Sequence, residues 1–337
     1  MGGNFFVVGD QVVKGLLGDK VEQALKDGNK KYIWDNDFSG ECTGNEIERM
    51  QKIYRENKCD AILGLGGGKS MDVAKGMTIG LNNCPLALVP TIAASDAPVS
   101  HVAIIYNEAH ERLRVDAMPY SPWVVLVDTE IILNAPAHFL ASGIADAVAT
   151  KFEAEACQAA GAKNYFASAP PRAAKIFGDA CWEILRKKGP LAYQAVKNKK
   201  YHPALEDVVE ANTLLSGIGF ESGGCAAAHG TMSALTALPA SAKYSHGQLV
   251  AVGIIVQMCM ENRPQEFILE MARFLKSLDL PTTLYGVGLD VDKDKEDFEL
   301  VIKKGSTPPG LMFNMPMEIN AAMFRKALLK ANEMGGQ

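Results

Sequence analysis

Three residues that lie far apart in the chain could together bind a metal ion. Two of the six histidines, His229 and His246, stand among alanine, glycine and serine residues, and Asp146 interrupts another small and apolar stretch. A buried carboxylate is costly unless a cation or hydrogen-bond donors accompany it, so Asp146 requires a partner. Two imidazoles, one carboxylate and a water molecule are the ligand set of a catalytic zinc ion. No short metal-binding spacing links the three residues, so the fold would have to assemble the site.

The local sequence leaves each histidine with two possible roles. His246 comes directly before the predicted helix 247–261, where the positive end of the helix dipole disfavours an imidazolium ion and keeps a nitrogen lone pair available for a cation. Alternatively, either histidine could be a structural residue with satisfied hydrogen bonds. Spacing alone does not decide between these roles.

A glycine-rich junction between a predicted strand and a predicted helix could bind a phosphate. Gly67, Gly68 and Lys69 stand at this junction, where backbone N–H groups and the helix dipole attract negative charge. Glycine suits the position because a Cβ would block the close approach of the backbone to a pyrophosphate. The run matches neither GxGxxG nor GxxxxGK[ST], so an ordinary glycine-rich turn is the alternative interpretation.

Asp10 follows the first predicted strand and is a second candidate for cofactor binding. From that position a carboxylate can accept a hydrogen bond from a ribose hydroxyl and repel a 2′-phosphate. Its alternative role is to cap the helix that comes next.

The elements that would position these residues divide the chain into two parts. Up to about residue 130, short apolar runs alternate with amphipathic stretches, which is typical of strands and helices around a parallel sheet. Thr43 and Glu46 form a predicted capping box for the helix after the second strand. The predicted strands are residues 4–8, 31–34, 61–65, 86–89 and 123–127.

The second part has the composition of helices. After residue 135 the β-branched runs fade, and segments rich in alanine, leucine and methionine follow. This change predicts a dinucleotide-binding α/β domain over residues 1–135 and a helical metal- and substrate-binding domain over residues 136–337. The predicted helices are residues 137–160, 173–188, 204–221, 247–261, 264–277 and 318–333.

The overall composition favours a small-molecule enzyme. A length of 337 residues, 48% hydrophobic residues and a net charge of −5 without a basic block predict a two-domain globular protein that binds neither nucleic acid nor a membrane. The seven cysteines are scattered and form no CxxC pair, as expected for reduced thiols in the cytoplasm. Neither a secretion signal nor an apolar run long enough to span a membrane is expected.

Taken in order, these segments resemble the glycerol dehydrogenase branch of the iron-containing alcohol dehydrogenase family. The resemblance spans nearly the whole chain and is carried by residues 66–75, 89–98, 143–147, 217–229, 244–247 and 277–281. It implies a Rossmann-like α/β N-terminal domain followed by an all-α C-terminal domain, the architecture shared with dehydroquinate synthase. It also implies an NAD-dependent enzyme that forms a homo-oligomer and oxidises a small polyol.

The resemblance assigns roles to individual residues. It implies that Asp146, His229 and His246 bind the metal, and that Asp96 contacts substrate hydroxyl groups. Thr150 stands where iron-dependent relatives look to have another histidine, which favours zinc over iron. By the same resemblance, Gly67, Gly68 and Lys69 contact the pyrophosphate, and the nicotinamide side is contacted by Thr91, Ser95, Ser100, Val102 and Tyr106.

The sequence departs from the family pattern at three places. The chain begins at what looks like the family's second strand, so an N-terminal hairpin is expected to be missing. Met232 stands where glycerol dehydrogenases commonly look to have a second histidine, and methionine cannot relay a proton. His101 stands where a small residue is expected.

The leading hypothesis is therefore metal-assisted oxidation of glycerol or a related vicinal diol by NAD, with Asp96 and the three metal ligands as the catalytic residues. A lyase of the dehydroquinate synthase type is one rival, but the basic cluster that would bind its sugar phosphate is not found near Asp96 or His246. A non-catalytic member of the family is the other rival. Met232 and the short N-terminus favour this second rival, whereas the intact metal ligands oppose it.

Overall fold

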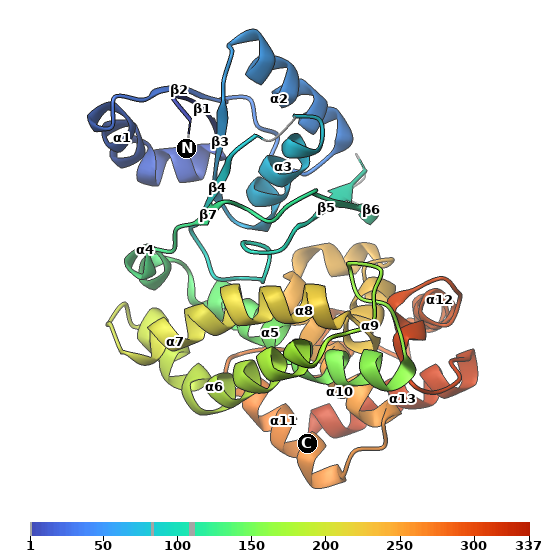
Figure 1. Ribbon diagram of the computed structural model, residues 1–337. Helices are drawn as coiled ribbons and strands as arrows, with labels where there is room; N and C mark the ends of the chain where they lie inside the picture. Colours follow the sequence, from blue (N-terminus) through green and yellow to red (C-terminus); the bar gives the residue numbers. More distant parts are fainter. Residues whose placement is uncertain (1, 82–83, 108–111) are drawn as a thin grey trace. The chain divides into compact units, whose positions relative to one another are not determined.

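The computed structural model describes residues 2–81, 84–107 and 112–337, and the chain divides into two compact units (Figure 1). The first unit comprises Met1–Ala93 and Ala97–Ala135, and the second comprises Ala94–Asp96 and Pro136–Gln337. The first unit contains a parallel sheet with helices, and the second is helical, which confirms the predicted fold class.

A parallel five-stranded sheet forms the centre of the first unit, with the order β2-β1-β3-β4-β7. Because β1 and β3 are neighbours, their carboxyl ends meet at the same edge of the sheet, where ligands bind in folds of this kind. The predicted strands are confirmed, although β7 is shorter than expected. The strands are β1 (Asn4–Val8), β2 (Lys31–Trp34), β3 (Ala61–Gly66), β4 (Leu86–Pro90) and β7 (Val124–Val125).

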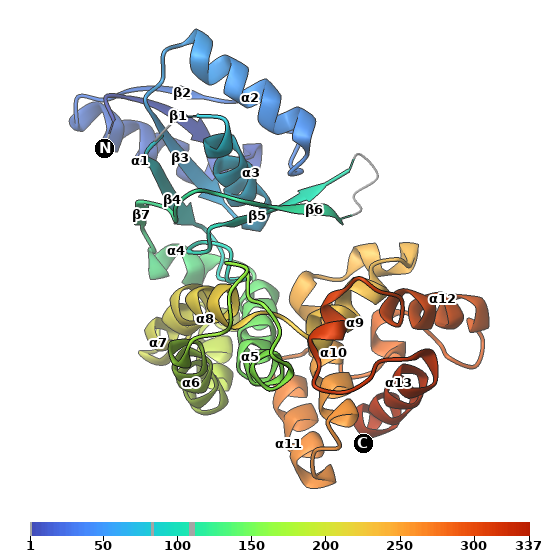
Figure 2. The same ribbon diagram turned by 45° about the vertical axis from the view of Figure 1, so that its right-hand side comes forward.

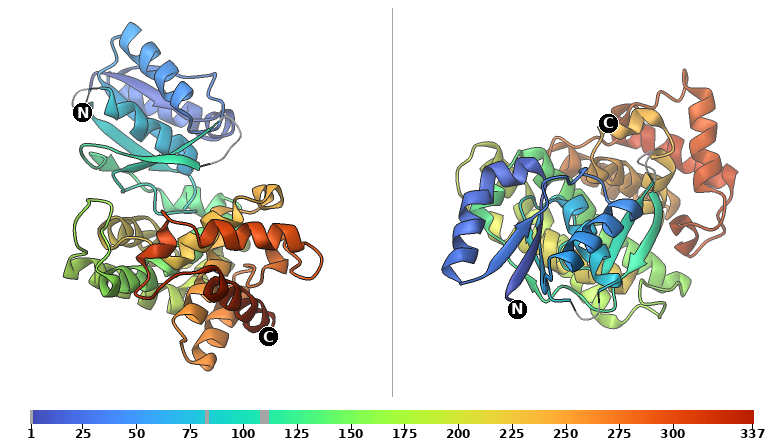
Figure 3. Two further views of the ribbon diagram at one scale, coloured as in Figure 1. Left: turned by 90° about the vertical axis from the view of Figure 1, so that its right-hand side faces the viewer. Right: turned by 90° about the horizontal axis from the view of Figure 1, so that it is seen from above.

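Helices cover both faces of this sheet. Alternate residues of β1 point to opposite faces, so Phe6 packs with α2 (Gly44–Glu56) and α3 (Gly68–Ile79), whereas Phe5 packs with α1 (Gln11–Asp27). The right-hand view in Figure 3 shows α1 on one side of the strands and α2 and α3 on the other. The short helix α4 (Thr129–Asn134) ends the unit.

An antiparallel pair of strands that the sequence analysis did not predict also belongs to the first unit. It consists of β5 (Val102–Tyr106) and β6 (Arg112–Ala117) and extends beside the main sheet (Figure 2). The structure shows one half of the predicted capping box of α2, in which the Thr43 side chain accepts a hydrogen bond from the Glu46 N–H. The Glu46 carboxylate binds the Ser39 N–H and Arg49.

The second unit is built from helices that pack around α5 and α10. The helix predicted at residues 137–160 is confirmed, and α6 continues through Pro190 beyond its predicted end. Helices α9 and α12 were not predicted. The helices are α5 (Ala137–Ala160), α6 (Arg172–Lys197), α7 (Ala204–Glu210), a π-helical turn (Ala211–Leu215), α8 (Ser216–Gly223), α9 (Ala227–Leu235), α10 (His246–Met260), α11 (Gln265–Lys276), α12 (Lys295–Gly305) and α13 (Ala321–Gly336), with 3₁₀ turns at Pro239–Lys243, Tyr285–Val287 and Leu311–Asn314.

Glycines let α10 approach two neighbouring helices closely. A Cβ on Gly247 would overlap the backbone of Ser142 in α5, and a Cβ on Gly253 would overlap the backbone of Ala228 in α9. Helix α10 is buried along nearly its whole length, as expected for a helix that is apolar all round. Within the described part of the chain, no helix has both the length and the apolar character needed to cross a membrane.

Candidate metal centre

Three helices of the second unit bring Asp146, His229 and His246 together. Asp146 lies on α5, His229 on α9, and His246 is the first residue of α10. The Asp146 Oδ1 atom is 3.1 Å from the Nε2 atom of each histidine, and the two Nε2 atoms are 3.2 Å apart. Each of the three residues can therefore offer one ligand atom to a single small cation.

The environment of Asp146 fits a divalent cation. This carboxylate is only 1% exposed, and its Oδ2 atom accepts no hydrogen bond from any residue that the structure describes. A buried acceptor without a partner is unfavourable, and a bound ion would satisfy it. The His246 side chain is 41% exposed, which leaves the cluster accessible from solvent. Two imidazoles and one carboxylate with an open side are a donor set that zinc accepts.

The charges of these residues depend on one another. Burial alone would raise the pKa of the Asp146 carboxyl, but His246 and His229 hold that pKa well below its usual value. Burial alone would lower the pKa of His229, but the negative charge of Glu153 and the contact with Asp146 raise it well above its usual value. These contacts favour the protonated form of His229 in the metal-free protein, and a metal ion that binds Nε2 has to displace the proton from that nitrogen.

This proton displacement predicts how metal affinity depends on pH. Because the pKa of His229 is raised in the metal-free protein, each ion that binds below this pKa releases a proton, so affinity increases with pH. We expect the zinc association constant to be lower at mildly acidic pH and to increase as the pH is raised through neutrality. Competition with a chromophoric chelator measures this dependence. An affinity that does not change with pH, once the chelator's own protonation is corrected for, would contradict the assignment of His229 as a ligand.

Local sequence features fix the start of α10 and thereby the position of His246. Ser245 and Gln248 form a reciprocal capping box, in which the Gln248 N–H donates to Ser245 Oγ and the Ser245 N–H donates to Gln248 Oε1. The Gly247 N–H donates to Ser142 Oγ on α5 at 3.0 Å. His246 is therefore held against the helix that carries Asp146.

Asp96 belongs to the same unit as the metal cluster. Its Oδ2 atom accepts a hydrogen bond from Ser216 Oγ at 3.0 Å, and Ser216 Oγ lies 2.9 Å from Thr150 Oγ1. Thr150 is one helical turn beyond Asp146 on α5, and Ser216 follows the π-helical turn. A short chain of buried hydroxyl groups thus connects Asp96 to the helix that carries Asp146. Ser216 was not among the predicted site residues.

The glycine loop lies at the N-terminus of α3. Gly66 has a φ of 136°, and a Cβ there would lie 2.7 Å from Ser70 Oγ, so the position requires glycine. Gly67 is the N-cap and Gly68 the first helical residue, so the loop presents backbone N–H groups at a helix terminus. The Lys69 ammonium group forms an ion pair with Glu41 at 2.7 Å.

Two further predicted cofactor residues lie at the same edge of the sheet as this loop. Asp10 is the N-cap of α1, and its side chain accepts a hydrogen bond from the Val13 N–H at 2.8 Å, as its alternative role predicted. The Thr91 N–H donates to Gly66 O, which places Thr91 directly beside the loop. The half-buried Ser95 follows in the same segment.

The remaining predicted contacts on the nicotinamide side are on or near β5. Ser100 and Val102 are buried, and the buried Lys75 ammonium group donates to Ser100 Oγ and to the Val102 carbonyl oxygen. Tyr106 is half-buried, and its N–H donates to Cys42 O. The structure therefore brings Ser100 and Val102 together around Lys75. Their role as cofactor contacts stays a prediction.

Two residues that depart from the family pattern are also buried. Met232 lies on α9, three residues after His229, and is 7% exposed. His101 is buried in the first unit, where its carbonyl oxygen accepts a hydrogen bond from the Met118 N–H.

Glu153 is a buried acid near the metal cluster and was not among the predicted site residues. It lies on α5 seven residues after Asp146, and its Oε2 atom is 2.6 Å from His229 Nδ1. The spacing of two acids by seven residues in an apolar helix could have revealed it, since this spacing places both on one helical face.

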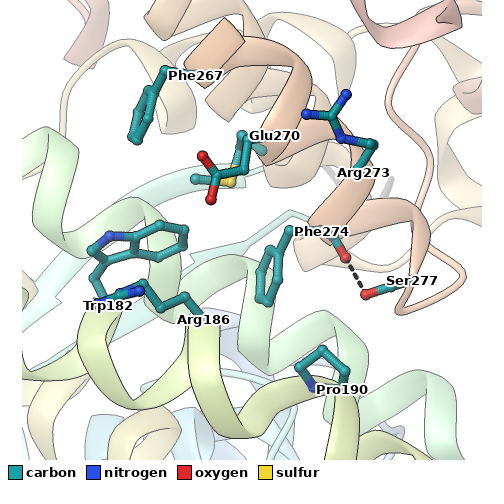
Figure 4. A pocket seen from close by; sticks show the side chains of 9 residues that line it. Trp182, Arg186, Pro190, Phe267, Glu270, Arg273, Phe274 and Ser277 are labelled. Atoms are coloured by element: carbon teal, nitrogen blue, oxygen red, sulfur yellow. Dashed lines mark hydrogen bonds between the residues drawn. The ribbon is translucent and has the colours of Figure 1, made fainter.

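A surface pocket of the second unit lies between α6 and α11 and contains none of the predicted site residues (Figure 4). This pocket is therefore separate from the candidate metal site, which is defined by the cluster of Asp146, His229 and His246. The pocket is lined by Trp182, Arg186, Pro190, Phe267, Glu270, Met271, Arg273, Phe274 and Ser277.

The chain is similar to known proteins in both sequence and structure. A profile of the iron-containing alcohol dehydrogenase family matches residues 1–129. Glycerol dehydrogenase from Thermotoga maritima is 40% identical over 331 residues, which cover 98% of this chain and 89% of that protein. Glycolaldehyde reductase from Halobacterium salinarum is 36% identical, with 99% of this chain and 91% of that protein covered. The crystal structure of glycerol dehydrogenase from Schizosaccharomyces pombe superposes with a TM-score of 0.93 at 30% identity, covering 99% of this chain and 84% of that chain.

Proposed function

The chain belongs to the iron-containing alcohol dehydrogenase family, and we propose that it oxidises glycerol or a related vicinal diol to the hydroxyketone with NAD. In this reaction a hydride leaves the carbinol carbon for the cofactor and a proton leaves the hydroxyl group. The convergence of Asp146, His229 and His246 carries the proposal. The names of the relatives, glycerol dehydrogenase and glycolaldehyde reductase, support a substrate with neighbouring oxygen atoms.

We propose zinc rather than iron as the metal. Asp146, His229 and His246 would hold it, and Thr150 stands where the iron-dependent relatives look to have a further histidine. Because the Thr150 hydroxyl group interacts with Ser216, it is engaged away from the cluster. A zinc ion bound there would act as a Lewis acid that lowers the pKa of a coordinated hydroxyl group.

Asp96 is proposed to select the substrate. A carboxylate accepts hydrogen bonds only, so it suits the hydroxyl group next to the one that is oxidised. Ser216 donates to one of its oxygen atoms and thereby restricts its orientation. This arrangement favours vicinal diols and hydroxyketones over simple alcohols.

We propose that residues 1–135 bind the dinucleotide and residues 136–337 bind the metal and the substrate. The glycine loop at the N-terminus of α3 supports binding of the pyrophosphate, and Asp10 at the end of β1 supports binding of a ribose hydroxyl. Asp10 caps α1 through its Oδ1 atom, so its Oδ2 atom could accept the hydrogen bond from the ribose hydroxyl. Thr91 and Ser95 would lie on the nicotinamide side, with Ser100, Val102 and Tyr106.

Replacing Lys69 by methionine should weaken dinucleotide binding. Methionine keeps much of the side-chain volume but removes the charge, and a charge-assisted hydrogen bond contributes about 1.5–3 kcal/mol. We therefore expect the NADH dissociation constant to rise about tenfold or more in a fluorescence titration. Lys52 is an exposed lysine on α2 and provides the matched control, Lys52→Met. Equal affinities in Lys69→Met and wild-type protein would exclude Lys69 from the cofactor site.

We also propose that the protein is a homo-oligomer and acts in the cytoplasm. All seven cysteines are buried and unpaired, which is compatible with a reducing compartment. The family resemblance supports the assembly, and sedimentation velocity would measure it.

An assay of the zinc-loaded protein tests the proposed function. NADH formation is measured with glycerol and ethylene glycol as vicinal diols and with ethanol as the matched simple alcohol. Dihydroxyacetone tests the reverse reaction with NADH. We expect both diols to react faster than ethanol, and removal of zinc by a chelator to abolish the activity. Zinc-dependent NADH formation from ethanol alone would contradict the role of Asp96, and no NADH formation from any alcohol would favour a non-catalytic family member.

A further inference from the structure

Glu153 forms hydrogen bonds with three N–H groups around His229. The carboxylate is only 1% exposed and lies on α5, the helix that carries Asp146. Its Oε1 atom accepts hydrogen bonds from the backbone N–H groups of Ala226 and His229, both at 2.8 Å. Its Oε2 atom lies 2.6 Å from His229 Nδ1. One side chain therefore contacts both the backbone and the ring of a proposed metal ligand.

These contacts also cap the helix that carries His229. The N-cap residue of α9 is Ala226, which has no side-chain oxygen to accept the first N–H groups of the helix. Glu153 accepts two of these hydrogen bonds, and Gln257 on α10 accepts the Ala228 N–H at 2.9 Å. The two helices that carry Asp146 and His246 thus supply the cap for the third.

The same contact determines which ring nitrogen of His229 can bind a metal. An ionised carboxylate has no hydrogen to donate, so the hydrogen of the short contact belongs to Nδ1. When the ring is neutral, Nε2 then carries the lone pair, and Nε2 is the atom that faces Asp146 and His246. Carboxylates that bind the second nitrogen of a metal-bound histidine orient the ring and increase its basicity.

We propose that Glu153 is a positioning residue for the metal site. It fixes the orientation and tautomer of His229 and thereby sets the affinity of the site for the metal. This inference rests on the proposed metal-binding function of Asp146, His229 and His246. It assigns a role to a residue that would not itself touch the metal.

Glu153→Gln separates the effect on the ring from the effect on the helix cap. The amide oxygen of glutamine can still accept the two backbone hydrogen bonds. Its NH₂ group, however, would lie against the Nδ1–H group of His229, so two hydrogen-bond donors would oppose each other. We expect zinc affinity, measured by chelator competition on the full chain, to fall about 10- to 100-fold. The visible absorption band of the protein loaded with Co²⁺ is expected to shift, because the orientation of one ligand changes.

Gln257→Met is the matched control, since it removes the cap on Ala228 without touching the imidazole. It should lower the urea midpoint of the metal-free protein and leave zinc affinity and the cobalt band close to wild type. Glu153→Asp keeps the charge but shortens the reach, so its zinc affinity should lie below wild type even if Glu153→Gln fails to fold.

Three results distinguish the possibilities. The inference is overturned if Glu153→Gln, or Glu153→Asp in its place, binds zinc as tightly as wild type. It is also overturned if Gln257→Met weakens zinc binding as strongly as Glu153→Gln does, because the role would then be structural. Failure of the wild-type protein to bind Zn²⁺ would instead contradict the proposed metal site.

Discussion

Replacing His229 by alanine is expected to abolish turnover and to leave NADH binding close to wild type. The substitution removes one of three ligand atoms that converge on the proposed ion, and it leaves Glu153 without the ring that it binds. A Lewis acid contributes several kcal/mol to such a reaction, so kcat should fall by at least about 10³-fold. The glycine loop lies in the other unit and does not depend on His229.

Metal content, NADH formation and NADH fluorescence together measure this effect. His138→Ala is the matched control, because His138 is an exposed histidine on α5, the helix that also carries Asp146. The control should keep its zinc and its activity. Turnover in His229→Ala that equals wild type would refute the assignment of this residue.

Gly247→Ala is expected to destabilise the protein and to disrupt the metal site at the same time. The added Cβ would overlap the backbone of Ser142, and a backbone cannot move aside as a flexible side chain can. The helices α10 and α5 would have to separate, which moves His246 away from Asp146. Overpacking of this kind typically costs about 1–3 kcal/mol, and more where the backbone is the obstacle.

Urea unfolding of the metal-free chain and zinc competition measure the two consequences. Gly15→Ala makes the same change in α1, where an added Cβ has no neighbour within 4 Å. This control should keep or raise the free energy of unfolding, because alanine is favoured over glycine inside a helix by about 1 kcal/mol. If Gly247→Ala matched this control in both stability and zinc affinity, the close approach of α10 to α5 would not be required.

The parts of the fold that could be predicted are those that local sequence specifies. The strands at residues 4–8 and 31–34 agree with β1 and β2 to the residue, because short β-branched and aromatic runs are bounded there by polar residues. Helix α5 also agrees at both ends, since Pro136 precedes it and Gly161 follows it in a left-handed conformation. In these cases the start and stop signals lie in the chain itself.

The elements that were missed depend on residues elsewhere in the fold. Helix α9 begins among alanines, and its cap comes from Glu153 and Gln257 on other helices, so its own sequence contains no start signal. The helix predicted at residues 173–188 is too short, because α6 continues through Pro190 to Lys197 and has buried residues beyond the proline. Strand β6 was missed because its sequence RLRVDA contains three charged residues.

The three proposed metal ligands could be predicted from the sequence, whereas the contacts that hold them in place could not. Asp146, His229 and His246 could be proposed from their residue types and from the family resemblance. Their three-dimensional convergence depends on glycine contacts between helices, at Gly247 and Gly253, which leave no local pattern. Similarly, Ser216 binds Asp96 across 120 residues of sequence, and no spacing rule predicts that contact.

Anomalous diffraction from crystals of the zinc-loaded protein would locate the metal and identify its ligands. We expect one zinc peak per chain, at about 2.0–2.2 Å from a carboxylate oxygen of Asp146 and from the Nε2 atoms of His229 and His246. A zinc peak bound elsewhere in the chain, with these three side chains uncoordinated, would contradict the proposed metal site.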